Sequence, residues 1–348
     1  MKIFNLNNFL RKNIKTIKPY TSARDEYKDT KADMVFLDAN ESPYNTGANR
    51  YPDPKQNDLK GEISRIKNIS PKNILIGNGS DEVLDLIFRA FCEPNKDSVI
   101  TLPPTYGMYS VLADLNAIEV KSILLDKQFQ PKTEEILKAQ NRTTKILFLC
   151  SPNNPTANSF EASKIEKLIQ NFNGIVVIDE AYIDFSVEES WLNQLSEFPN
   201  LIITQTLSKA YGLAGLRLGL CFASEDIISV LNNIKPPYNI NQLSQETAIE
   251  RLKSVDKVKT EINSIIENRA ELKEALKHIS FVKKIYPSDA NFLLGKVDDA
   301  DLRYQELIEK GVVVRNRSKQ PLCDNCLRFT VGTDKENESL ILALKDIE

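Results

Sequence analysis

The chain has 348 residues, of which 41% are apolar and 27% charged, and its formal net charge is −3. This composition is typical of a globular protein with up to two domains, and without a basic excess it argues against nucleic acid as a partner. No apolar run has membrane-spanning length, so we expect no membrane association. The first 20 residues lack the continuous apolar core of a signal peptide and indicate a short amphipathic segment.

The five cysteines are few and odd in number, which is typical of a reducing compartment, and we therefore expect a cytoplasmic protein. Cys323 and Cys326 form a single C-x-x-C pair without a second ligand pair. Because His278 is the only histidine, we expect two plain thiols and no metal site. A Ser-His-Asp catalytic site would likewise depend on that one histidine.

The first candidate site follows the apolar stretch NILI and reads GNGSDE, residues 77–82. An apolar helical pattern over 83–91 comes next, so the segment predicts a strand, a glycine turn and a helix N-terminus. Free N–H groups at such a terminus can bind an anion, although a plain cap by Ser80 or Asp81 is the more ordinary interpretation. Glu82 replaces the third glycine of a dinucleotide fingerprint.

Four short apolar runs predict strands buried on both faces, at 145–150, 174–179, 201–204 and 217–223. Helical patterns such as 161–171 lie between them. Strands that alternate with helices indicate a mostly parallel α/β sheet.

Polar residues follow three of these strands, at the edge where open parallel sheets bind ligands. SPNNPTAN, residues 151–158, forms a proline-rich loop that is either a simple turn or an asparagine held against a ligand. Asp179 ends the next strand and precedes Glu180-Ala181-Tyr182. A carboxylate at the end of a buried strand needs a partner, which is either a structural cation or a cationic ligand.

The sequence TLSK places Lys209 after the strand at 201–204, among small and apolar neighbours. Partial desolvation disfavours the ammonium form and leaves a nucleophilic amine that can form an imine with an aldehyde. Arg217 lies among glycines and can hold a phosphate through two parallel hydrogen bonds. An imine-forming lysine, a carboxylate, an asparagine, a helix N-terminus and an arginine together match the needs of pyridoxal 5'-phosphate.

A long helical pattern at 242–277 indicates a connector that leads out of the sheet domain. After it, residues 282–297 and 326–333 predict strands of a second, smaller α+β unit.

The chain resembles the fold-type I pyridoxal-phosphate aminotransferases nearly end to end. The resemblance is carried by LDANESPY, NRYPDP, GNGSDEVLDLIFRAF, PPTYGMYS, SPNNPT, DEAYIDF, TLSKAYGLAGLRLG and CLRFTVGT. PPTYGMY and NRYPDP favour the histidinol-phosphate branch of the family. Ala157 departs from the pattern, because the family usually has glycine after Pro-Thr.

The resemblance implies roles around the cofactor ring. Lys209 would hold the cofactor as a Schiff base and later move the proton. Asp179 would pair with the pyridinium nitrogen and remain ionised. Tyr182 and Asn154 would hydrogen-bond the phenolic oxygen, and Tyr106 would stack on the ring face.

The resemblance also implies how the cofactor phosphate is held. Ser208, Arg217 and the backbone around Ser80 and Asp81 would bind it. Tyr51 would reach the cofactor phosphate of the neighbouring subunit, which makes the enzyme an obligate homodimer.

Arg328 would bind the amino acid carboxylate, and Arg315 and Tyr20 would meet the anionic end of the substrate. The reaction implied is amino transfer between histidinol phosphate and 2-oxoglutarate, which gives imidazole acetol phosphate and glutamate in histidine biosynthesis. The fold implied is a large domain over 45–265, with a mostly parallel sheet flanked by helices, and a smaller α+β domain built from 1–44 and 266–348.

Other functions stay open on the sequence alone. A related aminotransferase for aromatic or other amino acids and a threonine-phosphate decarboxylase belong to the same superfamily. A cofactor-binding regulator without turnover is opposed by the complete catalytic set. A Ser-Lys hydrolase using Ser208 and Lys209 is disfavoured, because neighbours on an extended strand point to opposite faces.

Overall fold

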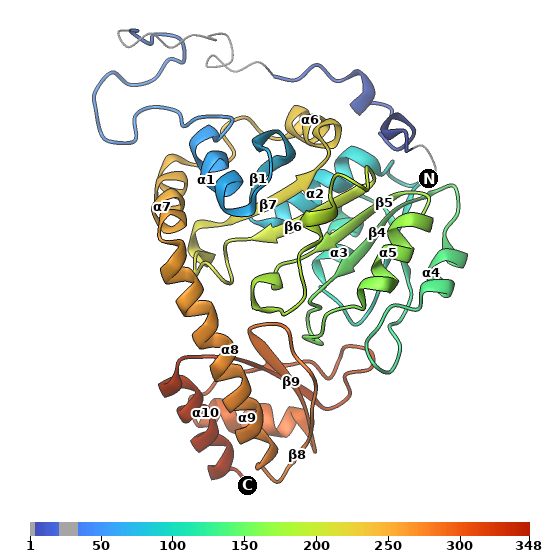
Figure 1. Cartoon of the computed structure of the whole chain (residues 1–348), viewed down its shortest axis with the longest axis vertical. Helices are drawn as coiled ribbons and strands as arrows, with labels where there is room; N and C mark the ends of the chain where they lie inside the picture. Colours follow the sequence, from blue (N-terminus) through green and yellow to red (C-terminus); the bar gives the residue numbers. More distant parts are fainter. Residues whose placement is uncertain (1–3, 21–33) are drawn as a thin grey trace.

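The chain forms two sheet-containing units joined by a long helix in the computed structural model, which describes residues 4–20 and 34–348 (Figure 1). The larger unit contains a seven-stranded sheet in the order β1-β7-β6-β5-β4-β2-β3. Only β7 runs against the other six strands, so the predicted mostly parallel sheet is confirmed. The strands are β1 Ile74–Asn78, β2 Ser98–Thr101, β3 Glu119–Ser122, β4 Thr144–Cys150, β5 Ile175–Asp179, β6 Leu201–Thr206 and β7 Leu218–Ala223.

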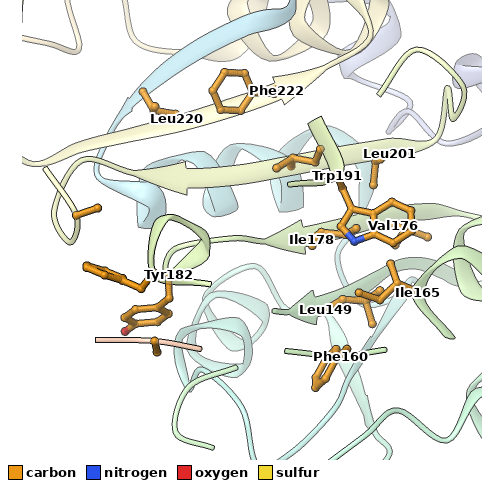
Figure 2. Packing of buried hydrophobic residues seen from close by; sticks show 14 of the residues in the cluster. Leu149, Phe160, Ile165, Val176, Ile178, Tyr182, Trp191, Leu201, Leu220 and Phe222 are labelled. Carbon is orange, nitrogen blue, oxygen red and sulfur yellow. The ribbon is translucent and has the colours of Figure 1, made fainter. Parts of the chain in front are cut away.

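Successive residues of the central strands enter two different apolar clusters, one on each face of the sheet. Val176 and Ile178 contribute to the first cluster, which Trp191 also joins (Figure 2). Ile175 and Val177 contribute to the second. Helices α1, α5 and α7 supply residues to the first cluster, and α2, α3 and α6 to the second. These helices, with α4, are α1 Asn57–Lys67, α2 Ser80–Phe91, α3 Met108–Leu115, α4 Thr133–Ala139, α5 Ala162–Asn171, α6 Glu225–Ile234 and α7 Gln242–Lys253.

The helical pattern expected over 242–277 is interrupted once. Ser254 ends α7 and begins α8 (Val255–Lys277), and its φ of −94° and ψ of 42° depart from helical values. Helix α8 has 23 residues and extends from the larger unit to the smaller one (Figure 1). Of the helices in the described residues, none has the length and apolar character needed to span a membrane.

The smaller unit is an antiparallel sheet in the order β10-β11-β9-β8, packed against helices. Its apolar cluster includes residues from the second half of α8, such as Leu272 and Leu276. The predicted second α+β unit is therefore present. Its elements are β8 Val282–Ile285, β9 Phe292–Val297, α9 Ala300–Glu309, β10 Arg315–Asn316, β11 Cys326–Thr330 and α10 Asp334–Asp346.

The N-terminal residues lie against the larger unit, which differs from the expected small-domain assignment of residues 1–44. Phe4, Leu6, Phe9 and Leu10 pack on the cluster that covers one face of the large sheet. The Arg11 N–H also donates to the carbonyl of α2 residue Ala90, at 3.0 Å. An amphipathic segment buries its apolar side where an apolar face is available, which here is beside α2. Residues 1–3 and 21–33 of the expected domain lie outside the described residues, and the boundary at 265 stays a prediction.

Candidate active site

The topology of the large sheet brings the predicted site residues to one edge. The parallel strands β1, β4, β5 and β6 end there, at Asn78, Cys150, Asp179 and Thr206. The antiparallel β7 begins at the same edge, because Leu218 pairs with Asn78 and Gly219 with Thr206. The loop before β7, the start of α2 and the turn after β6 therefore meet.

A cavity of about 360 Å³ opens at this edge and is lined by eleven of the thirteen residues selected from the sequence. Two of the eleven, Arg315 and Arg328, come from the small sheet, so the cavity lies between the two units. The eleven residues are Ser80, Asp81, Tyr106, Asn154, Asp179, Tyr182, Ser208, Lys209, Arg217, Arg315 and Arg328.

Lys209 lies in the turn after β6 and lines the cavity. Burial lowers the pKa of its ammonium group, and the nearby Arg328 and Arg217 lower it further, against the opposing effect of Asp179 and Asp81. Its Nζ lies 5.7 Å from the centre of the Tyr182 ring. The lowered pKa favours the neutral, nucleophilic amine, as the sequence predicted.

Asp179 is a buried carboxylate at the end of β5, with 4% of its surface exposed. The Tyr109 hydroxyl donates to its Oδ2 at 2.7 Å, whereas its Oδ1 is buried without a hydrogen-bond partner among the described residues. Burial raises the pKa of this carboxyl, and the Tyr109 hydrogen bond opposes the rise. An unpartnered buried oxygen beside a cavity suits an N–H⁺ group of a ligand.

The adjacent Glu180 has a different, structural role. Its carboxylate accepts hydrogen bonds from the Ser190 hydroxyl, the Trp191 backbone N–H at 2.8 Å and the Gln205 side chain at 2.8 Å. Successive residues of a strand point to opposite sides, so only Asp179 reaches the cavity.

Helix α2 begins at the cavity with free N–H groups. Its N-cap is Gly79, which has no side chain to cap the first turn, so the expected cap by Ser80 or Asp81 is wrong. Gly79 has φ of 82° and ψ of 162°, a backbone conformation that favours glycine. A Cβ at Gly219 would lie 2.2 Å from the Ser80 nitrogen, so this glycine is what allows β7 to pass the helix start.

Arg217 lies beside this helix start. Its backbone has φ of 55°, a left-handed conformation that costs a non-glycine residue about 1–3 kcal/mol and is found mainly at functional sites. Its Nη2 lies 3.6 Å from Asp81 Oδ2, and its side chain is half-exposed. A Cβ at Gly79 would lie 2.7 Å from the same Nη2. The guanidinium and the N–H groups of α2 together form a seat for a phosphate.

Aromatic and amide side chains line the rest of the cavity. Tyr182 is buried, and its ring packs edge-on against Phe292. The Tyr106 hydroxyl donates to Asp81 Oδ1 at 2.9 Å. Asn154 accepts from Arg328 Nη1 at 2.7 Å through its Oδ1, which leaves its N–H₂ as the donor for a ligand.

Tyr20 and Tyr51 do not reach this cavity within one chain. Both line another depression of about 490 Å³ beside Tyr238, and Tyr51 stacks on Tyr238 with ring centres 4.6 Å apart. Tyr20 is 73% exposed and Tyr51 52%. The structure therefore separates these two residues from the other eleven.

Ser208 and Lys209 do not have the extended conformation that was assumed for them from the sequence. Ser208 and Lys209 lie in a turn and line the same cavity, so the opposite-face argument against a Ser-Lys pair is wrong. No hydrogen bond joins their side chains in the described part of the chain.

Ala157 has φ of 70°, which accounts for the glycine that the resembled family has there.

The sequence analysis gave no role to Tyr109 or Arg317. Tyr109 falls on the apolar face of α3 and looks like an ordinary core aromatic. Arg317 also lines the cavity, two residues after Arg315. Its i, i+2 spacing from Arg315 in an extended segment was a usable signal.

The chain belongs to the class I and II aminotransferases. The model of the family "Aminotransferase class I and II" matches residues 24–344. A histidinol-phosphate aminotransferase of Flavobacterium johnsoniae is 62% identical over 346 residues, which cover 99% of both sequences. The family and fold class expected from the sequence are confirmed.

Two solved structures share the fold. A histidinol-phosphate aminotransferase of Sinorhizobium meliloti in complex with pyridoxal-5'-phosphate has a TM-score of 0.77 at 23% identity, over 86% of this chain and 84% of that one. An L-threonine-O-3-phosphate decarboxylase of Porphyromonas gingivalis has a TM-score of 0.73 at 24% identity, over 86% and 90%. Because both activities occur on this fold, the fold alone does not choose between them.

Proposed function

We propose that the protein is a pyridoxal 5'-phosphate-dependent aminotransferase that moves an amino group between histidinol phosphate and 2-oxoglutarate. The observation that carries the proposal is the cavity in which Lys209, Asp179 and Arg217 converge beneath the arginines of the small sheet. The near full-length identity of 62% to a histidinol-phosphate aminotransferase supports the choice of substrate.

The residues present fit the cofactor. The unpartnered Oδ1 of Asp179 would accept from the ring nitrogen, and the α2 N-terminus with Arg217 and Ser208 would hold the phosphate. Tyr106 would cover the ring, while the Asn154 N–H₂ and the Tyr182 hydroxyl would donate to the phenolic oxygen. When bound, pyridoxal phosphate supplies an aldehyde carbon that exchanges amines and a ring that accepts an electron pair.

Lys209 performs the proton transfers in this proposal. Its amine would hold the cofactor at the aldehyde carbon and would be freed when the substrate amine takes its place. The freed Nζ would take the proton from the substrate carbon that bears the amino group and would return a proton to the cofactor carbon. The lowered pKa of Lys209 keeps the amine available as a base.

Asp179 would keep the ring nitrogen protonated. Burial disfavours its ionised form, while the Tyr109 hydrogen bond favours it. A cationic ring nitrogen next to Oδ1 would offset the cost of burying the charge. The ionised carboxylate would thus lie next to the ring that accepts the electron pair.

The arginines of the small sheet receive the anionic ends of the substrates. Arg328, oriented by Asn154, would bind the carboxylate of glutamate or 2-oxoglutarate, and Arg315 would meet the far end of either substrate.

We also propose a homodimer in which Tyr51 reaches the cofactor phosphate of the neighbouring subunit. Its exposure and its distance from the cavity of its own chain support this role. Tyr20 lines the same depression as Tyr51, so it would meet the substrate from the same neighbour. A cytoplasmic location would suit the five free thiols.

A substrate panel tests the proposal. Purified, cofactor-loaded protein is given histidinol phosphate, phenylalanine or threonine phosphate, each with and without 2-oxoglutarate, and glutamate and carbon dioxide are measured. We expect glutamate from histidinol phosphate with the highest kcat/KM. Carbon dioxide from threonine phosphate, or a preference for phenylalanine, would contradict the proposal.

A further inference from the structure

We propose that Arg317 binds the phosphate of the phosphorylated substrate together with Arg315, and so favours a phosphate monoester over a second carboxylate. The inference rests on the proposed function and deepens it by naming the residue that recognises the phosphate. Nothing in the sequence motifs gave Arg317 a role, although it lines the cavity with Lys209 and Arg328.

Strand pairing places three guanidinium groups at one wall of the cavity. Arg315 in β10 lies directly opposite Arg328 in β11. The Arg317 N–H donates to the Cys326 carbonyl at 2.8 Å, which extends the pairing beyond β10. Side chains two residues apart in an extended segment share a face, so Arg315 and Arg317 both point to the cavity. Asn316 points away and donates to the Ala300 carbonyl at 3.3 Å.

This arrangement is unfavourable without an anion. Like charges directly opposite each other on paired strands are destabilising. Within residues 4–20 and 34–348, no carboxylate forms an ion pair with Arg315 or Arg317, and the buried Nε of Arg317 has no hydrogen-bond partner. The pKa of Arg317 is lowered to about 10, mainly by burial and also by the nearby charges of Arg328 and Arg315. A bound anion would remove this repulsion.

The other charged side chains of the cavity have assigned partners, so Arg317 is available for the substrate phosphate. Asp81 already faces Arg217, which would hold the cofactor phosphate, and Asp179 would face the ring nitrogen. Arg328 is oriented by Asn154 and suits one carboxylate. A single guanidinium at Arg315 can pair both oxygens of the second carboxylate of glutamate. A phosphate monoester has two negative charges and three free oxygens, so it can use a second guanidinium as well.

The test compares the two half-reactions of cofactor-loaded protein, followed by absorbance. Arg317→Gln is expected to lower kcat/KM for histidinol phosphate about 10–100-fold, since a hydrogen bond to a charged group contributes about 1.5–3 kcal/mol. The glutamate half-reaction should change by less than about 3-fold. Lys319→Gln is the matched control, because Lys319 is an exposed cation on the same loop outside the cavity, and neither half-reaction should change. Thermal unfolding should show that both variants are folded.

Inorganic phosphate separates this inference from the proposed function. As an inhibitor of the glutamate half-reaction, phosphate should bind the Arg317→Gln variant about 10-fold or more weakly than wild type, and the Lys319→Gln variant as wild type. If wild type fails to convert histidinol phosphate, the proposed function is wrong, and the phosphate inhibition still tests Arg317. Equal losses in both half-reactions, or unchanged phosphate inhibition, would overturn the inference.

Discussion

Replacing Tyr109 by phenylalanine should move the acidic limb of the pH–rate profile to higher pH. The Tyr109 hydroxyl donates to Asp179 Oδ2 at 2.7 Å, and both groups are buried. A hydrogen bond to a charged group contributes about 1.5–3 kcal/mol, and one pKa unit corresponds to about 1.4 kcal/mol. Its loss disfavours the ionised carboxylate and raises the pKa of Asp179 further, so the acidic limb should move up by about 1–2 pH units. The stacking of ring 109 on Phe148, with centres 4.8 Å apart, needs no hydroxyl and should persist.

The assay is kcat/KM for amino transfer from pH 5 to pH 9. Tyr106→Phe is the matched control, because it also removes a tyrosine-to-carboxylate hydrogen bond in the cavity, the one to Asp81. Its rate can fall, but its acidic limb should stay at the wild-type pH. An acidic limb that is unmoved in Tyr109→Phe, or moved equally in both variants, would refute the role given to the Tyr109 hydroxyl.

Other variants test other parts of the site. Because burial raises the pKa of Asp179, the folded cofactor-free protein holds this proton more tightly than the unfolded chain. Its stability should therefore fall as pH rises above the ordinary aspartate range, and Asp179→Asn should remove that fall in urea unfolding while abolishing transamination. Gly79→Ala strains a backbone whose φ of 82° favours glycine and puts a Cβ 2.7 Å from Arg217 Nη2, so it should weaken cofactor binding at least 10-fold in a fluorescence titration. In steady-state kinetics, Lys209→Ala should abolish transamination, whereas Arg315→Ala should mainly raise KM.

Each of these expectations has an outcome that contradicts it. For Gly79→Ala the matched control is Gly107→Ala, since a Cβ at Gly107 meets no atom within 4 Å. Equal cofactor affinity in both variants would contradict the role given to Gly79. An unchanged pH slope in Asp179→Asn would mean that another group causes it. Substantial turnover by Lys209→Ala would remove the lysine from the mechanism.

Local patterns in the sequence were enough to find the residues at the strand ends. Lys209, Asp179 and the loop of Asn154 each follow a short apolar run, and parallel strands bring their carboxyl ends to one edge. The glycine-rich setting of Arg217 indicated a phosphate ligand. Its position at this edge depends on the antiparallel pairing of β7, which no local pattern predicts.

Contacts between distant segments were the part that the sequence did not predict. Tyr109 and Asp179 are 70 residues apart, and a tyrosine on a buried helix face gives no sign of a carboxylate partner. The placement of Arg317 depends on the register of β10 against β11. The packing of Phe9 and its neighbours beside α2 is likewise a contact between distant segments, and no pattern within the N-terminal residues specifies it.

The most direct test of the account asks which side chain is joined to the cofactor. The cofactor-loaded protein is reduced with borohydride, digested, and the modified peptide is identified by mass spectrometry. We predict a single phosphopyridoxyl group on the peptide that contains Lys209. A group on another lysine, or an unmodified Lys209 in protein that retains the cofactor, would contradict it.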